Sequence, residues 1–128
     1  MVVCMEVIEH MSRENGIKLL DNIEAIMQPQ TTLIFSTPCF DEKVGMAESH
    51  MYEWKYLELK EELEKRFYIE DHFGTFISLK DYVKDMTPEE LRLLNRLKSY
   101  YNSALVSNIM APLYPEKSRN CLWVLKMK

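Results

Sequence analysis

Two carboxylates and an imidazole directly follow a short apolar run at the start of the chain. Residues 2–5 are apolar and predict a buried strand, after which come Glu6, Glu9 and His10. In open α/β sheets, ligands bind in the crevice beyond the carboxyl ends of the strands. Carboxylate and imidazole groups suit manganese, iron or zinc, and they also transfer protons. The pattern therefore predicts a site at the end of this strand.

A second histidine is expected at the same place. Residues 31–36 predict another strand, residues 39–49 have the composition of a loop, and His50 closes that loop. If the two strands are parallel, His50 lies in the same crevice, within about 10 Å of His10, and is a metal ligand or a general base on a substrate hydroxyl. The alternative is a loop histidine without either role. The predicted catalytic residues are Glu9, His10 and His50.

The elements that must position these groups form a βαβ unit. Ser12 is a good N-cap, and apolar residues recur at helical spacing from residue 17 to residue 27, before Pro29. A strand, a helix and a strand in this order predict a parallel pair joined by a right-handed crossover. The apolar positions of the predicted helix are Ile17, Leu20, Ile23 and Met27.

The rest of the chain predicts two helical segments and two strands. A helix is expected over residues 53–66, followed by a strand over 67–78 in which Gly74 marks a bulge or a close approach. Thr87 begins a capping box that opens a helix, continued by residues 103–110, and a last strand covers 121–125. The fold class is α/β, one domain over residues 1–128, with the last strand antiparallel. The buried faces are expected to contain Trp54, Leu57 and Leu63, and then Leu91, Leu94, Leu97 and Tyr101.

Composition narrows the classes of function. The net charge of -4 gives no electrostatic footprint for a long nucleic-acid duplex, although a short RNA end or a single flipped base stays open. Three widely spaced cysteines without a paired motif fit a reducing compartment. Neither a signal peptide nor an apolar run of about 20 residues is visible, so we expect a cytoplasmic protein with no membrane partner.

Two segments resemble the second half of class I S-adenosylmethionine (SAM) dependent methyltransferases. They are residues 4–11, CMEVIEHM, and residues 33–38, LIFSTP. The resemblance implies a partial Rossmann-like sheet made of the family's fourth to seventh strands, and methyl transfer to an oxygen or nitrogen of an acceptor that the sequence does not identify. Residues 111–115 and 118–123 are similar to small stand-alone methyltransferases of phage and environmental origin. The implied SAM-binding residues are Cys4, Met5 and Glu6.

A narrower similarity concerns the 2′-O-methyltransferases that modify the 3′ end of small RNAs. Those enzymes contain Glu-x-x-Glu-His and a later histidine followed by an aromatic-Glu-Trp run, as residues 6–10 and 50–54 do here. The resemblance implies a divalent metal that engages the terminal ribose hydroxyls. The alternative is that these groups cap the next helix and contact SAM or substrate without a metal. The implied metal ligands are Glu6, Glu9, His10 and His50.

The Gly-rich turn and the ribose-binding carboxylate of the methyltransferase family are missing from this sequence. Its three glycines, at positions 16, 45 and 74, form no GxG pattern. We therefore expect the C-terminal part of a methyltransferase domain, with weak SAM binding and no methyl transfer by residues 1–128 alone. The first strand would then be an apolar edge open to self-association or to a partner chain. A non-catalytic or split half that acts as an interaction module is the alternative function.

Overall fold

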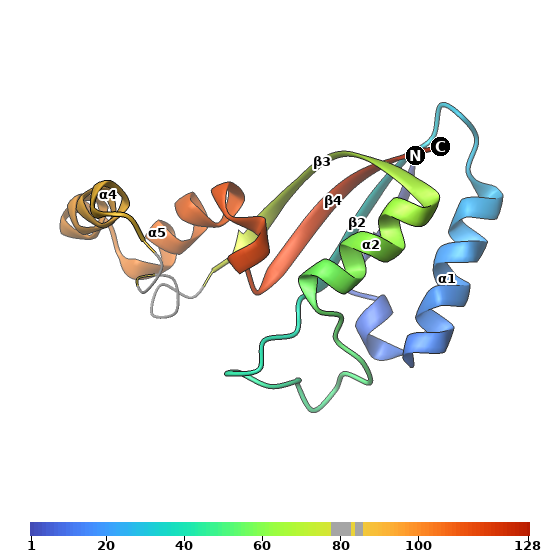
Figure 1. Cartoon of the computed structure of the whole chain (residues 1–128), viewed down its shortest axis with the longest axis horizontal. Coiled ribbons are helices and arrows are strands. Elements are labelled where there is room, and N and C mark those ends of the chain that lie inside the picture. The colour runs from blue at the N-terminus through green and yellow to red at the C-terminus, as the bar shows by residue number, and fades with distance from the viewer. Residues whose placement is uncertain (78–82, 84–85) are drawn as a thin grey trace.

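The protein has an α/β fold with an open, four-stranded mixed sheet (Figure 1). The computed structural model describes the chain except for residues 78–82 and 84–85. The strands lie side by side in the order β1-β2-β4-β3; β1 and β2 are parallel, and β4 is antiparallel to both of its neighbours. The strands are β1 (Val2–Met5), β2 (Thr32–Pro38), β3 (Phe67–Phe76) and β4 (Asn120–Met127).

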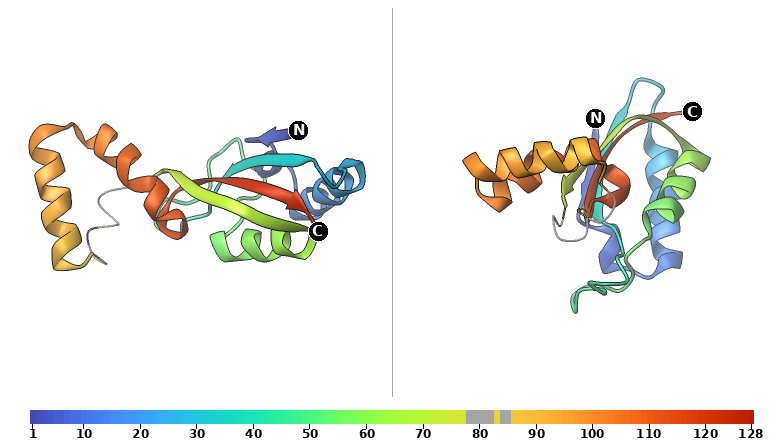
Figure 2. Two further views of the ribbon diagram at one scale, coloured as in Figure 1. Left: turned by 90° about the horizontal axis from the view of Figure 1, so that it is seen from above. Right: turned by 60° about the vertical axis from the view of Figure 1, so that its left-hand side comes forward.

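The helices fall into two groups. Two of them pack against the sheet, and two others stand off one end of it, as Figures 1 and 2 show. The packed pair is α1 (Arg13–Ile26) and α2 (Tyr56–Arg66), and the distant pair is α4 (Pro88–Tyr100) and α5 (Ser103–Met110). Short 3₁₀ helices are η1 (Ile8–His10), η3 (Ala111–Leu113) and η4 (Pro115–Lys117). Among the described residues, no helix has both the length and the apolar character that a membrane span requires.

Several expectations from the sequence are confirmed. The Ser12 side chain accepts a hydrogen bond from the Asn15 amide at the start of α1, and the βαβ unit has parallel strands. Thr87 and Glu90 form the capping box of α4. The last strand is antiparallel as predicted, and it lies inside the sheet between β2 and β3. The strand predicted over residues 67–78 ends at Phe76; its last predicted residue, Ser78, lies outside the described residues.

Two residues that were predicted on buried faces, Leu57 and Tyr101, are exposed, whereas Trp54, Leu63 and Leu94 are buried as predicted. Leu57 is 67% exposed, because it precedes Leu63 by six residues and therefore lies on a different side of the helix; α2 (Tyr56–Arg66) buries Leu59 and Leu63, which are one turn apart. Tyr101 is 48% exposed, because α4 ends one residue earlier and Tyr101 is its extended C-cap.

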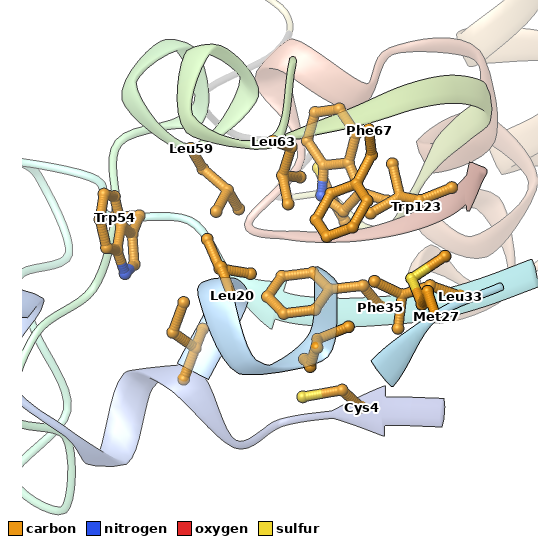
Figure 3. Packing of buried hydrophobic residues seen from close by; sticks show 14 of the residues in the cluster. Cys4, Leu20, Met27, Leu33, Phe35, Trp54, Leu59, Leu63, Phe67 and Trp123 are labelled. Carbon is orange, nitrogen blue, oxygen red and sulfur yellow. The ribbon is translucent and has the colours of Figure 1, made fainter. Parts of the chain in front are cut away.

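The main core lies between the sheet and the helices α1 and α2. Figure 3 shows Leu20 of α1 and Leu59 of α2 directed toward one another, beside Phe35 of β2. The opposite face of the sheet is less covered: Val3 is exposed, and Ile34 and Val124, which align with it across β2 and β4, are half-buried. A smaller second cluster joins the distant helices to the end of β3; it consists of Ile77, Leu94, Val106, Met110 and Ala111.

Gly74 confirms the predicted close approach. A Cβ atom at this position would lie 1.8 Å from Ser118 Oγ and 2.4 Å from the carbonyl oxygen of Ala111. The β3 backbone therefore lies directly against the segment that leads into β4. The amide of Arg119 donates to the Phe76 carbonyl at 2.8 Å, and this contact fixes the start of β4.

Candidate functional site

Glu6 lies at the carboxyl end of β1, in a backbone conformation that is unusual for its residue type. Its φ angle of 54° is in the left-handed region, which costs an L-residue about 1–2 kcal/mol. The Glu6 amide donates to the Ser36 carbonyl at 2.9 Å, and its carboxylate accepts hydrogen bonds from Ser36 Oγ (2.7 Å) and Asn120 Nδ2 (3.0 and 3.1 Å). Glu6 thus links β1, β2 and β4 at one end of the sheet, where β1 and β2 finish and β4 begins.

Glu9 is buried beneath the loop that follows β2. Its side chain is 1% exposed, and its Oε2 accepts a hydrogen bond from Thr37 Oγ1 at 2.9 Å. Its backbone carbonyl accepts from the amides of Met51 (2.8 Å) and Tyr52 (3.2 Å). Residue 9 therefore fixes the position of the segment that contains His50.

The ring of His10 is half-exposed and oriented by a backbone carbonyl. Nδ1 lies 3.0 Å from the carbonyl oxygen of Ser49, which can only accept, so Nδ1 is the donor in this hydrogen bond. In the neutral ring, Nε2 then has a free lone pair. That nitrogen lies 3.9 Å from Glu9 Oε1.

His50 is oriented by a carboxylate. Its Nδ1 lies 2.6 Å from Glu53 Oε1, and the Glu53 side chain is fully buried. Burial alone raises the pKa of Glu53, but hydrogen bonds from His50 and the Ala47 amide, together with Arg119, outweigh burial and hold that pKa below its ordinary value. An ionised carboxylate only accepts, so Nδ1 of His50 carries the proton and Nε2 is free in the neutral ring.

The two histidines and Glu9 form one cluster. The ring centroids of His10 and His50 are 5.0 Å apart, with the rings nearly perpendicular at 86°. Glu9, His10 and His50 each offer one ligand atom, and these atoms all lie within 4.8 Å of one another. Nδ1 of each imidazole lies against an acceptor, and metal-bound histidines in proteins are usually oriented by such a partner on the nitrogen that does not bind the metal. The cluster thus brings together the kinds of donor atom that a divalent metal or a proton transfer would require.

The other residues predicted for the site are arranged differently. Met5 is 48% exposed and lies next to Glu6 at the open end of β1, whereas the Cys4 side chain belongs to the hydrophobic core. Glu6 is not a member of the three-residue cluster; its carboxylate is bonded to Ser36 and Asn120. The structure therefore brings together three of the four predicted metal ligands.

Sequence reasoning missed the residues that support the cluster. Glu53 could have been found, because it follows His50 at a spacing of three within the His-x-x-Glu run. Thr37 lies at the end of the predicted second strand, where an inward hydroxyl is a candidate partner for a buried carboxylate. Arg119, whose Nη2 lies 2.7 Å from Glu53 Oε2, is distant in the chain and has no local signal.

An open cleft of about 650 Å³ adjoins this supporting layer. It lies between the start of the loop after β2, the first turn of α2 and the segment around η4. Cys39, Tyr56 and Arg119 are among its lining residues. Because Arg119 borders the cleft and also contacts Glu53, a molecule in the cleft would touch the layer that orients His50.

Comparison with known proteins adds no family assignment. No protein-family model matches the chain, and no curated protein matches it. The geometry of the cluster and the sequence motifs are the observations on which its function is proposed.

Replacing Thr37 by Val should destabilise the protein. The change keeps the shape of the side chain but removes the hydrogen bond to the buried Glu9 carboxylate, which predicts a loss of about 1.5–3 kcal/mol in the free energy of unfolding. Urea denaturation measures this loss. Thr75→Val is the matched control, because the Thr75 hydroxyl bonds at the exposed surface and its removal should change stability by only about 0.5 kcal/mol. Equal effects of the two substitutions would contradict the expected role of Thr37.

Proposed function

We propose that this chain is the acceptor-side part of a class I SAM-dependent methyltransferase that transfers a methyl group to an oxygen or nitrogen. The observation that carries the proposal is the gathering of Glu9, His10 and His50 beyond the carboxyl ends of the parallel strands β1 and β2. The two segments that resemble the family, residues 4–11 and 33–38, contain the carboxyl ends of those same two strands. The antiparallel last strand agrees with the element order that the resemblance implies.

For methyl transfer from SAM, the protein has to position the methyl donor and the acceptor rather than form a covalent intermediate. SAM, when bound, supplies a methyl group on a sulfonium. The acceptor atom attacks the methyl carbon as the carbon–sulfur bond breaks, and the acceptor proton leaves to a base. Nε2 of His10 and Nε2 of His50 are the atoms suited to take that proton, because Nδ1 of each ring is already a donor. We assign the SAM-side wall to Met5 and Glu6, and exclude Cys4 because its side chain lies in the core.

SAM should perturb the end of β1 and leave the distant helices unchanged. In two-dimensional NMR spectra of the labelled chain, we expect millimolar SAM to shift the amide signals of Met5, Glu6 and Val7, with weak affinity because the chain contains no Gly-rich turn. ADP is the control for binding through the adenosine group alone. Unchanged β1 signals, or micromolar binding with shifts elsewhere, would show that the cofactor does not use this wall.

The cluster also fits a divalent metal. Two imidazoles and a buried carboxylate are a donor set for manganese, iron or zinc. We propose Glu9, His10 and His50 as the ligands. A metal at this position would act as a Lewis acid that lowers the pKa of an acceptor hydroxyl. Glu6, whose carboxylate is held by Ser36 and Asn120, would support the edge of the site.

His10→Ala should abolish stoichiometric binding of Mn²⁺ or Zn²⁺ and leave the fold intact. The affected side chain is half-exposed, so its loss removes a ligand without opening the core. Isothermal titration of protein purified without chelator measures the binding. His72→Ala is the matched control, because His72 contacts Tyr56 and Trp123 and lies outside the cluster. Absence of metal binding by the unaltered chain would remove the metal from the proposal while leaving methyl transfer open.

An interaction module is the second candidate function. β1 is an edge strand, and its side chains Val3 and Met5 are 54% and 48% exposed. An apolar edge of this kind presents unpaired backbone groups and invites a further strand. In this second proposal, two copies of the chain pair through β1, and the cluster has no catalytic role.

Val3→Lys tests the second candidate. Pairing two copies at β1 would bring the new charges together, and like charges across an interface cost several kcal/mol, so self-association should weaken by at least about tenfold. Sedimentation velocity over a range of concentrations measures the change. Ile26→Lys replaces an apolar residue of α1 that is 69% exposed and serves as the control. A concentrated unaltered chain that remains monomeric would reject pairing through β1.

A further inference from the structure

Arg119 links the start of β4 to both ends of the loop that contains His50. Its guanidinium donates to the carbonyl oxygen of Cys39, a residue 80 positions away, and to that of Gly45 at 3.0 Å. Nη2 also lies 2.7 Å from Glu53 Oε2. The Cys39 amide donates to the Arg119 carbonyl at 2.8 Å. One side chain, only 18% exposed, thus holds the first residue, the middle and the end of this loop.

The ion pair between Arg119 and Glu53 determines which partner each oxygen of the Glu53 carboxylate faces. Its two oxygens have separate partners: Oε2 pairs with Arg119, and Oε1 accepts from the Ala47 amide and from Nδ1 of His50. The ion pair at Oε2 and the Ala47 amide at Oε1 together favour one orientation of the carboxylate. Oε1 is therefore held toward the imidazole, and a carboxylate in this orientation selects the tautomer with the proton on Nδ1.

We propose that Arg119 is a positioning residue that, through Glu53, keeps the neutral ring of His50 in the Nδ1–H tautomer, so that the lone pair of the ring is on Nε2. The tautomer is a property of the protein without a bound metal. The effect of Arg119 on metal affinity, in contrast, rests on the proposed function. A guanidinium is required because its planar fork reaches a carboxylate and two carbonyls at once. A lysine ammonium, with its single nitrogen, cannot reach all three acceptors in the same way.

Long-range ¹H–¹⁵N NMR spectra of histidine-labelled protein test the inference directly, since they distinguish a protonated from an unprotonated ring nitrogen. At a pH at which the imidazole is neutral, we expect His50 of the unaltered chain to have its single ring proton on Nδ1. In Arg119→Met, we expect a mixture of both tautomers. Where the unaltered chain binds Mn²⁺ or Zn²⁺, the affinity should fall by about 10- to 100-fold, as for other outer partners of metal ligands.

Arg66→Met is the matched control. The Arg66 side chain is 13% exposed and pairs with Asp21 and Glu62, so its loss disturbs a comparable ion network at the C-terminal end of α2. The His50 signals should keep the pattern of the unaltered chain in this variant. A tautomer mixture in Arg66→Met as well would mean that general loosening of the fold is responsible, and it would overturn the specific role of Arg119.

Arg119→Lys covers the case in which Arg119→Met does not fold. It keeps the positive charge but loses the fork, so an intermediate tautomer mixture is expected. A single Nδ1–H tautomer in every folded Arg119 variant would overturn the proposal. Absence of Mn²⁺ and Zn²⁺ binding by the unaltered chain, together with tautomer mixing in the Arg119 variants, would reject the proposed metal and uphold the positioning role. If the unaltered chain and Arg119→Met bind metal equally and the tautomer does not change, the positioning role is rejected and the proposed metal is upheld.

Discussion

The buried carboxylate of Glu53 is the constraint on which the site depends. A charge removed from water costs several kcal/mol unless a partner compensates it, and removing one member of a buried pair typically costs about 3–5 kcal/mol. Glu53 is compensated by Arg119 and by the His50 ring. These groups come from the start of β4 and from the loop after β2, so the folded sheet must be complete before the carboxylate is satisfied. The geometry around His50 is therefore coupled to the stability of the fold.

The sequence predicted the parts of the structure that depend on local chemistry. The βαβ unit follows from an N-cap at Ser12 and from the periodicity of α1, and the capping box at Thr87 is determined by neighbouring residues. The approach of His10 and His50 was also expected, because parallel strands end at a common edge. The capping signals are local, and the pairing of two strands joined by one helix follows from the order of elements, so neither requires knowledge of more distant contacts.

The features that sequence reasoning missed depend on long-range packing. The position of β4 between β2 and β3 is set by pairing along both of its edges. Trp54 lies outside α2 because it forms a β-bridge with Cys39, a residue of the preceding loop, so the helix begins only at Tyr56. Arg119 and Glu53 meet only because β4 enters the sheet beside the loop. No short window of sequence contains such information, and the resemblance to a family did not supply it.

The left-handed backbone of Glu6 has a consequence for how this position tolerates change. Glycine adopts such a φ angle without penalty, so a glycine here would relieve the backbone while deleting the carboxylate that joins Ser36 to Asn120. The glutamate instead combines the strained backbone with a carboxylate that bonds to residues of β2 and β4. The effect of Glu6→Gly on stability is therefore the difference between two opposing contributions, a relaxed backbone and the loss of three side-chain hydrogen bonds.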